Sequence, residues 1–249
     1  MTGSAANQGS ARIAMDGPGA SRDGVSGNGD EGRADAAYRF LRNAILTGDI
    51  PVGFQATEVE VAARLGMSRT PVHEAMARLQ EEGFVQIFPR RGILVKGLSP
   101  ADLLEIYDIL IGLEGAAAER LASGGGDAIV DVVGELSALT DRMEQALDAN
   151  DLDAWAEADQ AFHDALVQRC GNRRIRRLAE TVSGQSHRAR RLTLNMRPLP
   201  RQSAAEHRAI VEAIAASDPG GAGKAARGHR RRARDQLVPI LKRLNLNAL

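Results

Sequence analysis

Apolar residues recur at helical spacing in three segments near the start of the chain, and each segment is closed by a glycine. The first begins at Ala34, the second at Thr57 and the third at Ser68, whose side chain suits the N-cap position. The second segment ends at Gly66 and the third at Gly83, as expected where a helix terminates in a left-handed residue. The pattern therefore predicts three short helices, with only a tight turn between the second and the third.

Two β-branched and aromatic runs follow the third helix. Residues 84–88 (FVQIF) and 93–96 (ILVK) flank the turn PRRG at 89–92, which is typical of a hairpin. Two helices joined by a tight turn and followed by a hairpin form a winged helix-turn-helix, in which the third helix is the recognition helix. We therefore expect such a domain over residues 34–97.

Beyond Lys96 the pattern is helical, with no convincing strand, and Ser99 suits the N-cap of the first of about six helices. Segments rich in Gly, Pro, Asn or Asp separate these helices at 123–127, 148–153, 170–172, 196–200 and 217–223. The predicted fold class is mainly α: an N-terminal winged helix-turn-helix with a small β-hairpin wing, and a C-terminal all-α helical bundle over residues 98–245.

Composition adds limits to this picture. Residues 1–33 are rich in Gly, Ser, Ala and Asp without an apolar period, so we expect a disordered tail. The length of 249 residues suits two domains, and the single cysteine, Cys170, excludes an intramolecular disulfide and any multi-cysteine metal site. With no apolar run long enough for a membrane span and no signal-peptide pattern, we expect a cytoplasmic protein without a membrane partner.

Charge is balanced over the whole chain but not along it. The chain carries 32 basic and 32 acidic residues, so its net charge does not indicate a nucleic-acid partner. Residues 97–172 hold 16 acidic and 3 basic side chains, whereas residues 173–200 hold 8 basic and 1 acidic. We interpret this difference as oppositely charged helices that pack within one domain.

Specific motifs lie in the winged segment: SRTPV at 68–72, EA two residues later, L..EG at the exit of the third helix, and RG at the wing tip. In this order they closely resemble the DNA-binding domain of the GntR family of bacterial transcription regulators. The remainder is similar to the C-terminal domain of the FadR subfamily, through DQAFHDAL followed by GN, then EHRAIVEAI, then GH. The resemblance implies a ligand-responsive regulator and not an enzyme, in which residues 98–245 form the effector-binding and dimerisation domain. We expect a repressor that binds a pseudo-palindromic double-stranded DNA operator as a homodimer.

The recognition helix and the wing carry groups suited to DNA, since a helix N-terminus favours phosphate and arginine can bind guanine in a bidentate manner. The candidate DNA-binding residues are Ser68, Arg69, Thr70 and His73 in the helix and Arg90, Arg91 and Gly92 at the wing tip. Taken singly, the arginines equally suit a helix cap and a solvated turn, but the order of the motifs favours DNA contact. The resemblance usually places a second arginine at His73 and a helix-two contact at Val59, so these departures affect the operator sequence.

Asp159 and His163 are four residues apart, so both project from one face of a helix and can bind one cation. Taken alone, such a pair is more often solvated. FadR-type domains with a metal carry an aspartate and three histidines in this order, and the resemblance therefore adds His207 and His229. Three imidazoles and a carboxylate suit a divalent ion such as zinc or nickel, with a position left for water or an anionic effector.

The effector site is less clearly marked. The family's first bundle helix commonly carries an arginine where this chain has Leu110, which weakens the expectation of a simple carboxylate within the organic acid class. His187, Arg188 and Arg191 are the candidate effector-binding residues, since they offer cations from another helix. Two alternatives stay open: a metal-sensing regulator without an organic effector, and a metal-dependent hydrolase, for which no strong general base emerges.

Overall fold

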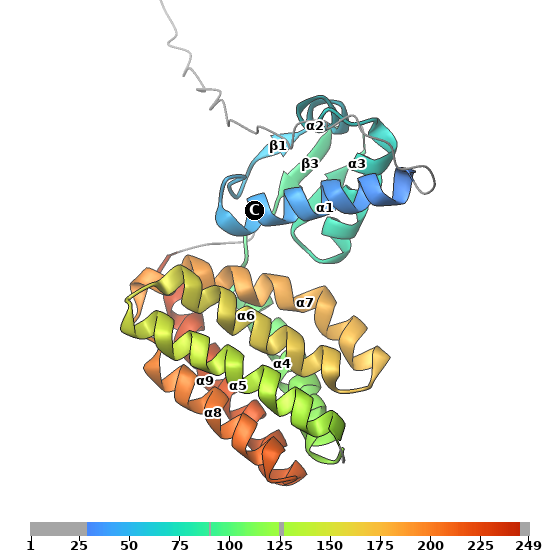
Figure 1. The fold of residues 1–249 in the computed structure, drawn as a ribbon. Helices are drawn as coiled ribbons and strands as arrows, with labels where there is room; N and C mark the ends of the chain where they lie inside the picture. Colours follow the sequence, from blue (N-terminus) through green and yellow to red (C-terminus); the bar gives the residue numbers. More distant parts are fainter. Residues whose placement is uncertain (1–28, 90, 125–126, 245–249) are drawn as a thin grey trace, which may run out of the picture. The chain divides into compact units, whose positions relative to one another are not determined.

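The computed structural model describes residues 29–89, 91–124 and 127–244 (Figure 1). The chain divides into two compact units, of which the first ends at Val95 and the second continues from Lys96, with Glu81–Phe84 also assigned to the second. Most of the predicted tail lies outside the described residues. Its last five positions, however, are helical, because α1 begins at Gly29 and not at Ala34.

The first unit contains the predicted helices and wing. Its elements are α1 (Gly29–Thr47), β1 (Gln55–Ala56), α2 (Glu58–Leu65), α3 (Arg69–Glu81), β2 (Val85–Phe88) and β3 (Gly92–Val95). The start of α2 is a capping box, in which the side chains of Thr57 and Glu60 each accept from the other residue's backbone N–H. The helix ends at Gly66, which has a φ of +63°. These local interactions explain why the sequence pattern located α2 closely.

The wing is a three-stranded antiparallel sheet in the order β1-β3-β2, in which Ala56 pairs with Ile93 and Ile87 pairs with Ile93 from the other side. The sequence pattern predicted the β2–β3 hairpin but not β1, because a strand of two residues is too short to show alternation. Gly92 begins β3 with a φ of +89°, and a Cβ there would lie 2.1 Å from the carbonyl oxygen of Ala56. The close approach of β1 therefore requires glycine at this position.

The second unit is a helical bundle, as predicted. Its described helices are α4 (Pro100–Ala122), α5 (Asp127–Asp148), α6 (Leu152–Arg169), α7 (Arg173–Leu192), the short 3-10 helix η1 (Leu194–Met196), α8 (Arg201–Ala215) and α9 (Pro219–Arg243). Helix α4 packs against α6, α7, α8 and α9 and is therefore the central helix of this unit (Figure 1). Among the described residues, no helix is both long and apolar enough to cross a membrane.

The start of α9 differs from the sequence prediction. We expected a break over 217–223, but α9 begins at Pro219, with the Asp218 side chain accepting from the N–H of Gly221. The glycines that indicated a loop are thus in the first turns of the helix. A Cβ at Gly223 would lie 2.5 Å from the side-chain Cγ of Glu119 on α4, so the glycine allows α4 and α9 to pack closely.

Candidate metal centre and nucleic-acid interface

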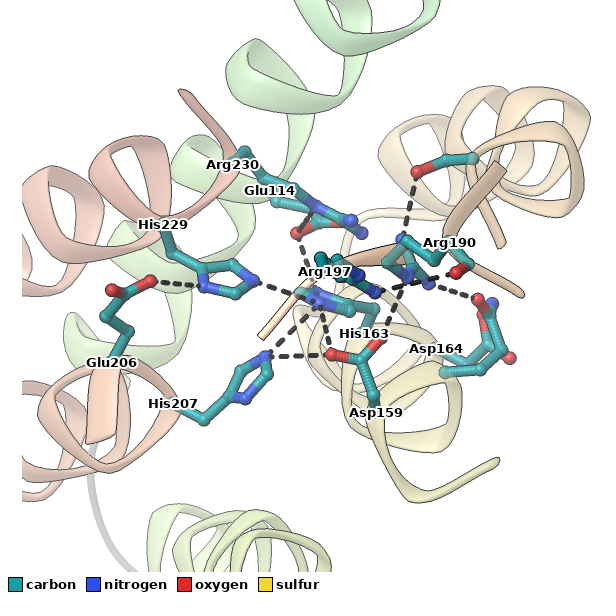
Figure 2. A network of polar contacts seen from close by, with 12 residues as sticks. Glu114, Asp159, His163, Asp164, Arg190, Arg197, Glu206, His207, His229 and Arg230 are labelled. Atoms are coloured by element: carbon teal, nitrogen blue, oxygen red, sulfur yellow. Dashed lines mark hydrogen bonds and ion pairs between the residues drawn. The ribbon is translucent and has the colours of Figure 1, made fainter. Parts of the chain in front are cut away.

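Four predicted ligands meet inside the bundle, and each is at least 96% buried (Figure 2). Asp159 and His163 lie one turn apart on α6, His207 comes from α8 and His229 from α9. One ligand atom from each of the four lies within 4.8 Å of the others. The structure therefore brings together, from three helices, side chains that are up to 70 positions apart in the sequence.

The Nε2 atoms of the three imidazoles point toward one another. The Nε2 atom of His163 lies 3.3 Å from Nε2 of His207 and 3.3 Å from Nε2 of His229. The Oδ1 atom of Asp159 lies 3.7 Å from Nε2 of His207 and 3.9 Å from Nε2 of His163. Metal–ligand bonds of about 2.0–2.2 Å place two tetrahedral ligands about 3.3–3.6 Å apart, so these separations are close to those of a shared divalent ion.

Two further carboxylates orient two of the imidazoles. Oε2 of Glu114 on α4 lies 3.0 Å from Nδ1 of His163, and Oε2 of Glu206 on α8 lies 2.9 Å from Nδ1 of His229. An ionised carboxylate can only accept, so each Nδ1 donates, and each neutral ring keeps a lone pair on Nε2. The Nε2 atoms of His163 and His229 would then face each other with no proton between them. A bound cation removes this repulsion, so the donor set fits a metal ion.

The protonation states of the ligands also suit a metal. Burial raises the pKa of the Asp159 carboxyl, but nearby positive charge, above all the Arg190 guanidinium, lowers it by a larger amount, so its net pKa lies well below the usual range. Burial and, next, the Arg230 guanidinium hold the pKa of His163 well below its ordinary value. Burial and the adjacent imidazoles likewise lower the pKa of His207. The carboxylate and neutral rings are the forms that bind a divalent cation.

A cavity of about 360 Å³ opens beside this cluster, and Asp159 and His229 form part of its wall. Binding cavities for small molecules commonly have volumes of this order. The same wall includes Arg190, Arg197 and Trp155. Figure 2 shows both guanidinium groups on the Asp159 side of the cluster. The cavity therefore combines candidate metal ligands with fixed positive charge.

The two arginines differ in how they are paired. Nε of Arg190 forms an ion pair with Oδ2 of Asp159 at 2.8 Å, although the N–H direction does not meet hydrogen-bond geometry. Arg197 forms no ion pair with a carboxylate of the described residues. Its Nη2 donates to the carbonyl oxygen of Arg190 at 3.5 Å, and its buried Nε has no hydrogen-bond partner in this part of the chain. Its guanidinium carbon lies 5.6 Å from the centre of the Trp155 ring. Because burial lowers the pKa of Arg197, this cation favours an anionic partner.

The predicted effector residues lie elsewhere on α7. His187 is buried, Arg188 is buried and donates to the carbonyl oxygen of Lys96 at 2.8 Å, and Arg191 pairs with Asp153 at 2.9 Å. None of the three lines the cavity among the described residues. The helical phase explains the difference, because the α7 side chain that points to Asp159 is the intervening Arg190.

Sequence reasoning did not identify Glu114, Glu206, Arg190 or Arg197. Glu206 directly precedes a predicted ligand, and Glu114 lies one turn after Leu110, where the expected arginine is missing. Neither position carries a pattern that distinguishes it from an ordinary helix-surface glutamate. Only the packing of α4 and α8 against α6 and α9 shows what these carboxylates contact.

The predicted DNA-binding residues of the recognition helix are on the surface of the first unit. Ser68, Arg69, Thr70 and His73 are all exposed at the start of α3. Nη2 of Arg69 lies 3.6 Å from Oε2 of Glu58 on α2, and Nδ1 of His73 lies 2.7 Å from Oε1 of Glu58. The same carboxylate thus contacts both side chains. Both stay accessible to solvent while they are paired with Glu58.

The wing tip is described in part. Arg91 is exposed, and its backbone N–H donates to the carbonyl oxygen of Phe88 in the turn between β2 and β3. Arg90 lies outside the described residues. Gly92 is held by the strand geometry given above, so its need for a positive φ explains this residue without any contact to DNA.

Comparison with known proteins agrees with these two units. Residues 33–95 match the family described as bacterial regulatory proteins, gntR family, and residues 105–232 match the FCD domain. The chain belongs to the GntR family of transcription regulators, with an FCD domain at its C-terminal side. The winged unit of this GntR protein is thus a DNA-binding domain, and its bundle is the ligand-binding domain of a transcription regulator.

Relatives of the GntR protein carry regulator names. It is 33% identical over 213 residues to an HTH-type transcriptional regulator in an unstable DNA locus of Streptomyces ambofaciens, covering 86% of this chain and 88% of the relative. It is 56% identical over 136 residues to an HTH-type regulator in the TAR-I ttuE-ttuC' intergenic region of Agrobacterium vitis, covering 55% of this chain and 80% of the relative. The repressor GlaR of Escherichia coli is 27% identical over 199 residues, covering 77% and 90%.

Solved structures support the fold. A GntR regulator from Rhodococcus sp. RHA1 superposes with a TM-score of 0.68 at 24% identity, covering 84% of this chain and 98% of that one. McbR/YncC of E. coli superposes with a TM-score of 0.69 at 20% identity, covering 86% and 98%. At these identities the likeness shows the shared fold.

Proposed function

We propose that this GntR protein is a repressor that binds a pseudo-palindromic operator as a homodimer and responds to an organic anion bound beside a metal ion in the FCD domain. The observation that supports the proposal is the buried convergence of three imidazoles and a carboxylate on a cavity that is also lined by Arg197, whose cation has no carboxylate partner among the described residues. Because the operator is chromosomal DNA, the proposed function places the protein in the cytoplasm.

In this proposal Asp159, His163, His207 and His229 hold the metal ion. The donor set favours zinc or nickel, since imidazole and carboxylate suit borderline divalent ions. When bound, the ion would supply a Lewis-acidic contact for an oxygen of the effector. The carboxylates of Glu114 and Glu206 keep two imidazoles in the orientation that directs Nε2 inward.

The effector is an organic acid small enough for a cavity of about 360 Å³. One acidic group of the effector would bind the metal ion on the side of Asp159 and His229. A second oxygen-bearing group of the effector would be bound by Arg197, with Arg190 adding positive charge. We propose these two arginines in place of His187, Arg188 and Arg191, because their side chains form the wall of the cavity. Trp155 forms part of the same wall and supports the Arg197 guanidinium through its ring face.

Ser68, Arg69, Thr70, His73 and the wing tip would contact the operator. A guanidinium at the start of α3 can bind a base edge or a phosphate, which requires Arg69 to exchange its contact with Glu58 for DNA. An effector changes operator binding only if it binds the DNA-competent and DNA-incompetent arrangements of the dimer with different affinity.

The hydrolase alternative has less support from the site. A general base should be free to take a proton, whereas Glu114 is bound by Arg230 and His163, and Glu206 is bound by His229 and Arg232. The metal-sensing alternative uses the same four ligands and differs only in whether the cavity binds an organic anion.

The test is an electrophoretic shift on DNA from upstream of the gene, with metal-loaded protein and a series of small organic acids. We expect one acid to release the parent protein from DNA, and Arg197→Met to require a higher concentration of the same acid. Arg201→Met is the matched control, because Arg201 pairs with exposed Asp148 and does not line the cavity. No shift at all would refute the regulator; release by removal of metal alone would favour the metal sensor.

A further inference from the structure

A buried glutamate of the central helix contacts the metal cluster without being one of its ligands. Glu114 lies in α4 with 2% exposure, and its Oε2 atom accepts from Nδ1 of His163 at 3.0 Å. The same oxygen accepts from Nε of Arg230 at 2.7 Å, and Oε1 accepts from Nη2 of Arg230. Figure 2 shows Glu114 lying between the Arg230 and His163 side chains. All three side chains are buried, so this interaction is not weakened by solvent.

The partners of Glu114 connect three helices. On α9, His229 faces the other imidazoles while the next residue, Arg230, turns to α4 and forms the two bonds to Glu114. On α6, His163 contacts the other two imidazoles through Nε2 and Glu114 through Nδ1. Helix α4 supplies none of the four candidate ligands, but it holds one of them through a carboxylate fixed by α9.

Sharing of Oε2 by two donors requires a carboxylate. If an amide carbonyl took the place of Oε2, the amide NH2 would face the Nη2 donor of Arg230, because both groups donate. The His163 ring would then lose either its partner or the geometry of its partner. Glutamate is therefore the residue that can satisfy the guanidinium and the imidazole at the same time.

We propose that Glu114 is a positioning residue of the metal centre, which fixes the His163 ring with Nε2 toward the ion and makes the order of α4 depend on whether metal is bound. This inference rests on the proposed metal site and adds a path from it to the central helix. Only residues 97–99 separate α4 from Lys96, where the second unit continues from the wing strand β3. Metal occupancy would thus reach the helix that is joined most directly to the DNA-binding unit.

The same pair of helices offers a matched control. Glu119 on α4 accepts from Nη2 of Arg227 on α9 at 2.6 Å, and these side chains are 40% and 30% exposed. Glu119→Gln therefore removes an α4–α9 ion pair of the same chemistry at a position that makes no contact with a candidate metal ligand.

The first measurement is the zinc affinity of the full chain after removal of metal, determined by competition with a chromophoric chelator. Glu114→Gln should weaken zinc binding by about 10–100-fold, the range typical for loss of an outer carboxylate, whereas Glu119→Gln should match the parent. The second is hydrogen exchange with and without zinc. Zinc should slow exchange in α4, α6, α8 and α9 of the parent, but only in α6, α8 and α9 of Glu114→Gln.

Loss of Glu114 could unfold the protein by leaving Arg230 unpaired, so a second variant removes both charges. In the double variant Glu114→Met/Arg230→Met, two apolar side chains of similar volume fill the space of the buried ion pair. This variant should show the same weaker zinc binding as Glu114→Gln. Unchanged zinc affinity in either folded variant, or equal slowing of α4 exchange in parent and variant, would overturn the inference while leaving the metal site intact. A parent that takes up no zinc or nickel would instead overturn the metal site itself.

Discussion

The recognition helix and the metal cluster place functional residues in opposite environments. At the start of α3, Arg69 and His73 are 70% and 61% exposed, and each lies close to the carboxylate of Glu58. In the bundle, His163 and His207 are almost fully buried, and each lies within 4 Å of several other polar groups. Exposed residues can therefore be exchanged nearly one at a time, whereas a change at one buried group alters the surroundings of all the others.

The same contrast applies to ion pairs. Arg230 and Glu114 are buried together, whereas Arg208 pairs with Asp141 and Glu144 at the surface. Coulomb energy is reduced by solvent at the surface, while a buried charge that loses its partner keeps the full cost of desolvation. Substitutions at buried charges should therefore have larger effects than substitutions at exposed ones.

The largest effect should come from breaking the buried pair. Arg230→Ala leaves Glu114 as an unpaired buried carboxylate, so we expect a loss of about 3–5 kcal/mol in the free energy of unfolding. Arg208→Ala should lose no more than about 1 kcal/mol, because its partners are exposed. Urea unfolding followed by circular dichroism measures both. Similar losses of unfolding free energy for the two variants would mean that burial does not increase the contribution of the Arg230–Glu114 pair to stability.

Removal of a ligand should affect metal binding more than removal of an outer carboxylate. His207→Ala takes one imidazole from the cluster, and we expect its zinc affinity to fall by more than the roughly 100-fold upper range for outer partners. Because the ligands and the winged domain are in separate units, the variant should still bind operator DNA. Elemental analysis measures the metal content of the variant, and an electrophoretic shift measures its binding to operator DNA. Normal metal content in this variant would remove His207 from the site.

At the exposed site we expect a moderate effect that depends on base identity. Arg69→Ala should weaken operator binding by about 1–3 kcal/mol if the guanidinium reads a base, and should relax preference at that position. Titrations across a salt series separate this from a phosphate contact, which would weaken all sequences equally and reduce the salt dependence. Equal affinity of variant and parent at every salt concentration would exclude Arg69 from the interface.

The smallest effect is a pH dependence of the metal-free protein. The folded-state pKa values of His163 and His207 lie below their unfolded value of about 6.5, so the unfolded chain binds more protons as pH falls. Stability should therefore decrease below about pH 6.5, by no more than about 1.4 kcal/mol per pH unit for each imidazole. Melting at pH 7.5, 6.5 and 5.5 after chelation measures this slope, which His207→Ala should reduce. A flat profile would contradict the depressed pKa values.

Much of the fold could be predicted from sequence because its signals are local. The capping box at Thr57, the turn at Gly66 and the apolar spacing of α3 each act over a few residues, so the winged helix-turn-helix was identified in order. The glycines at 220–223 were misleading, since glycine indicates a loop in isolation but permits close packing when a neighbouring helix is present. Strand β1 could not be found, because its two residues are a strand only when β3 lies beside them.

By itself, the sequence determined that Asp159 and His163 share a helix face, because four residues make about one turn. It also determined that Arg69 begins the recognition helix. The packing of the helices was needed to show that His207 and His229, which the family resemblance had added, reach the same point, that Arg190 and not Arg191 faces Asp159, and that Glu114 contacts His163. The physical reason is that helical periodicity sets direction within one helix, whereas distances between helices depend on how side chains along their whole lengths pack together.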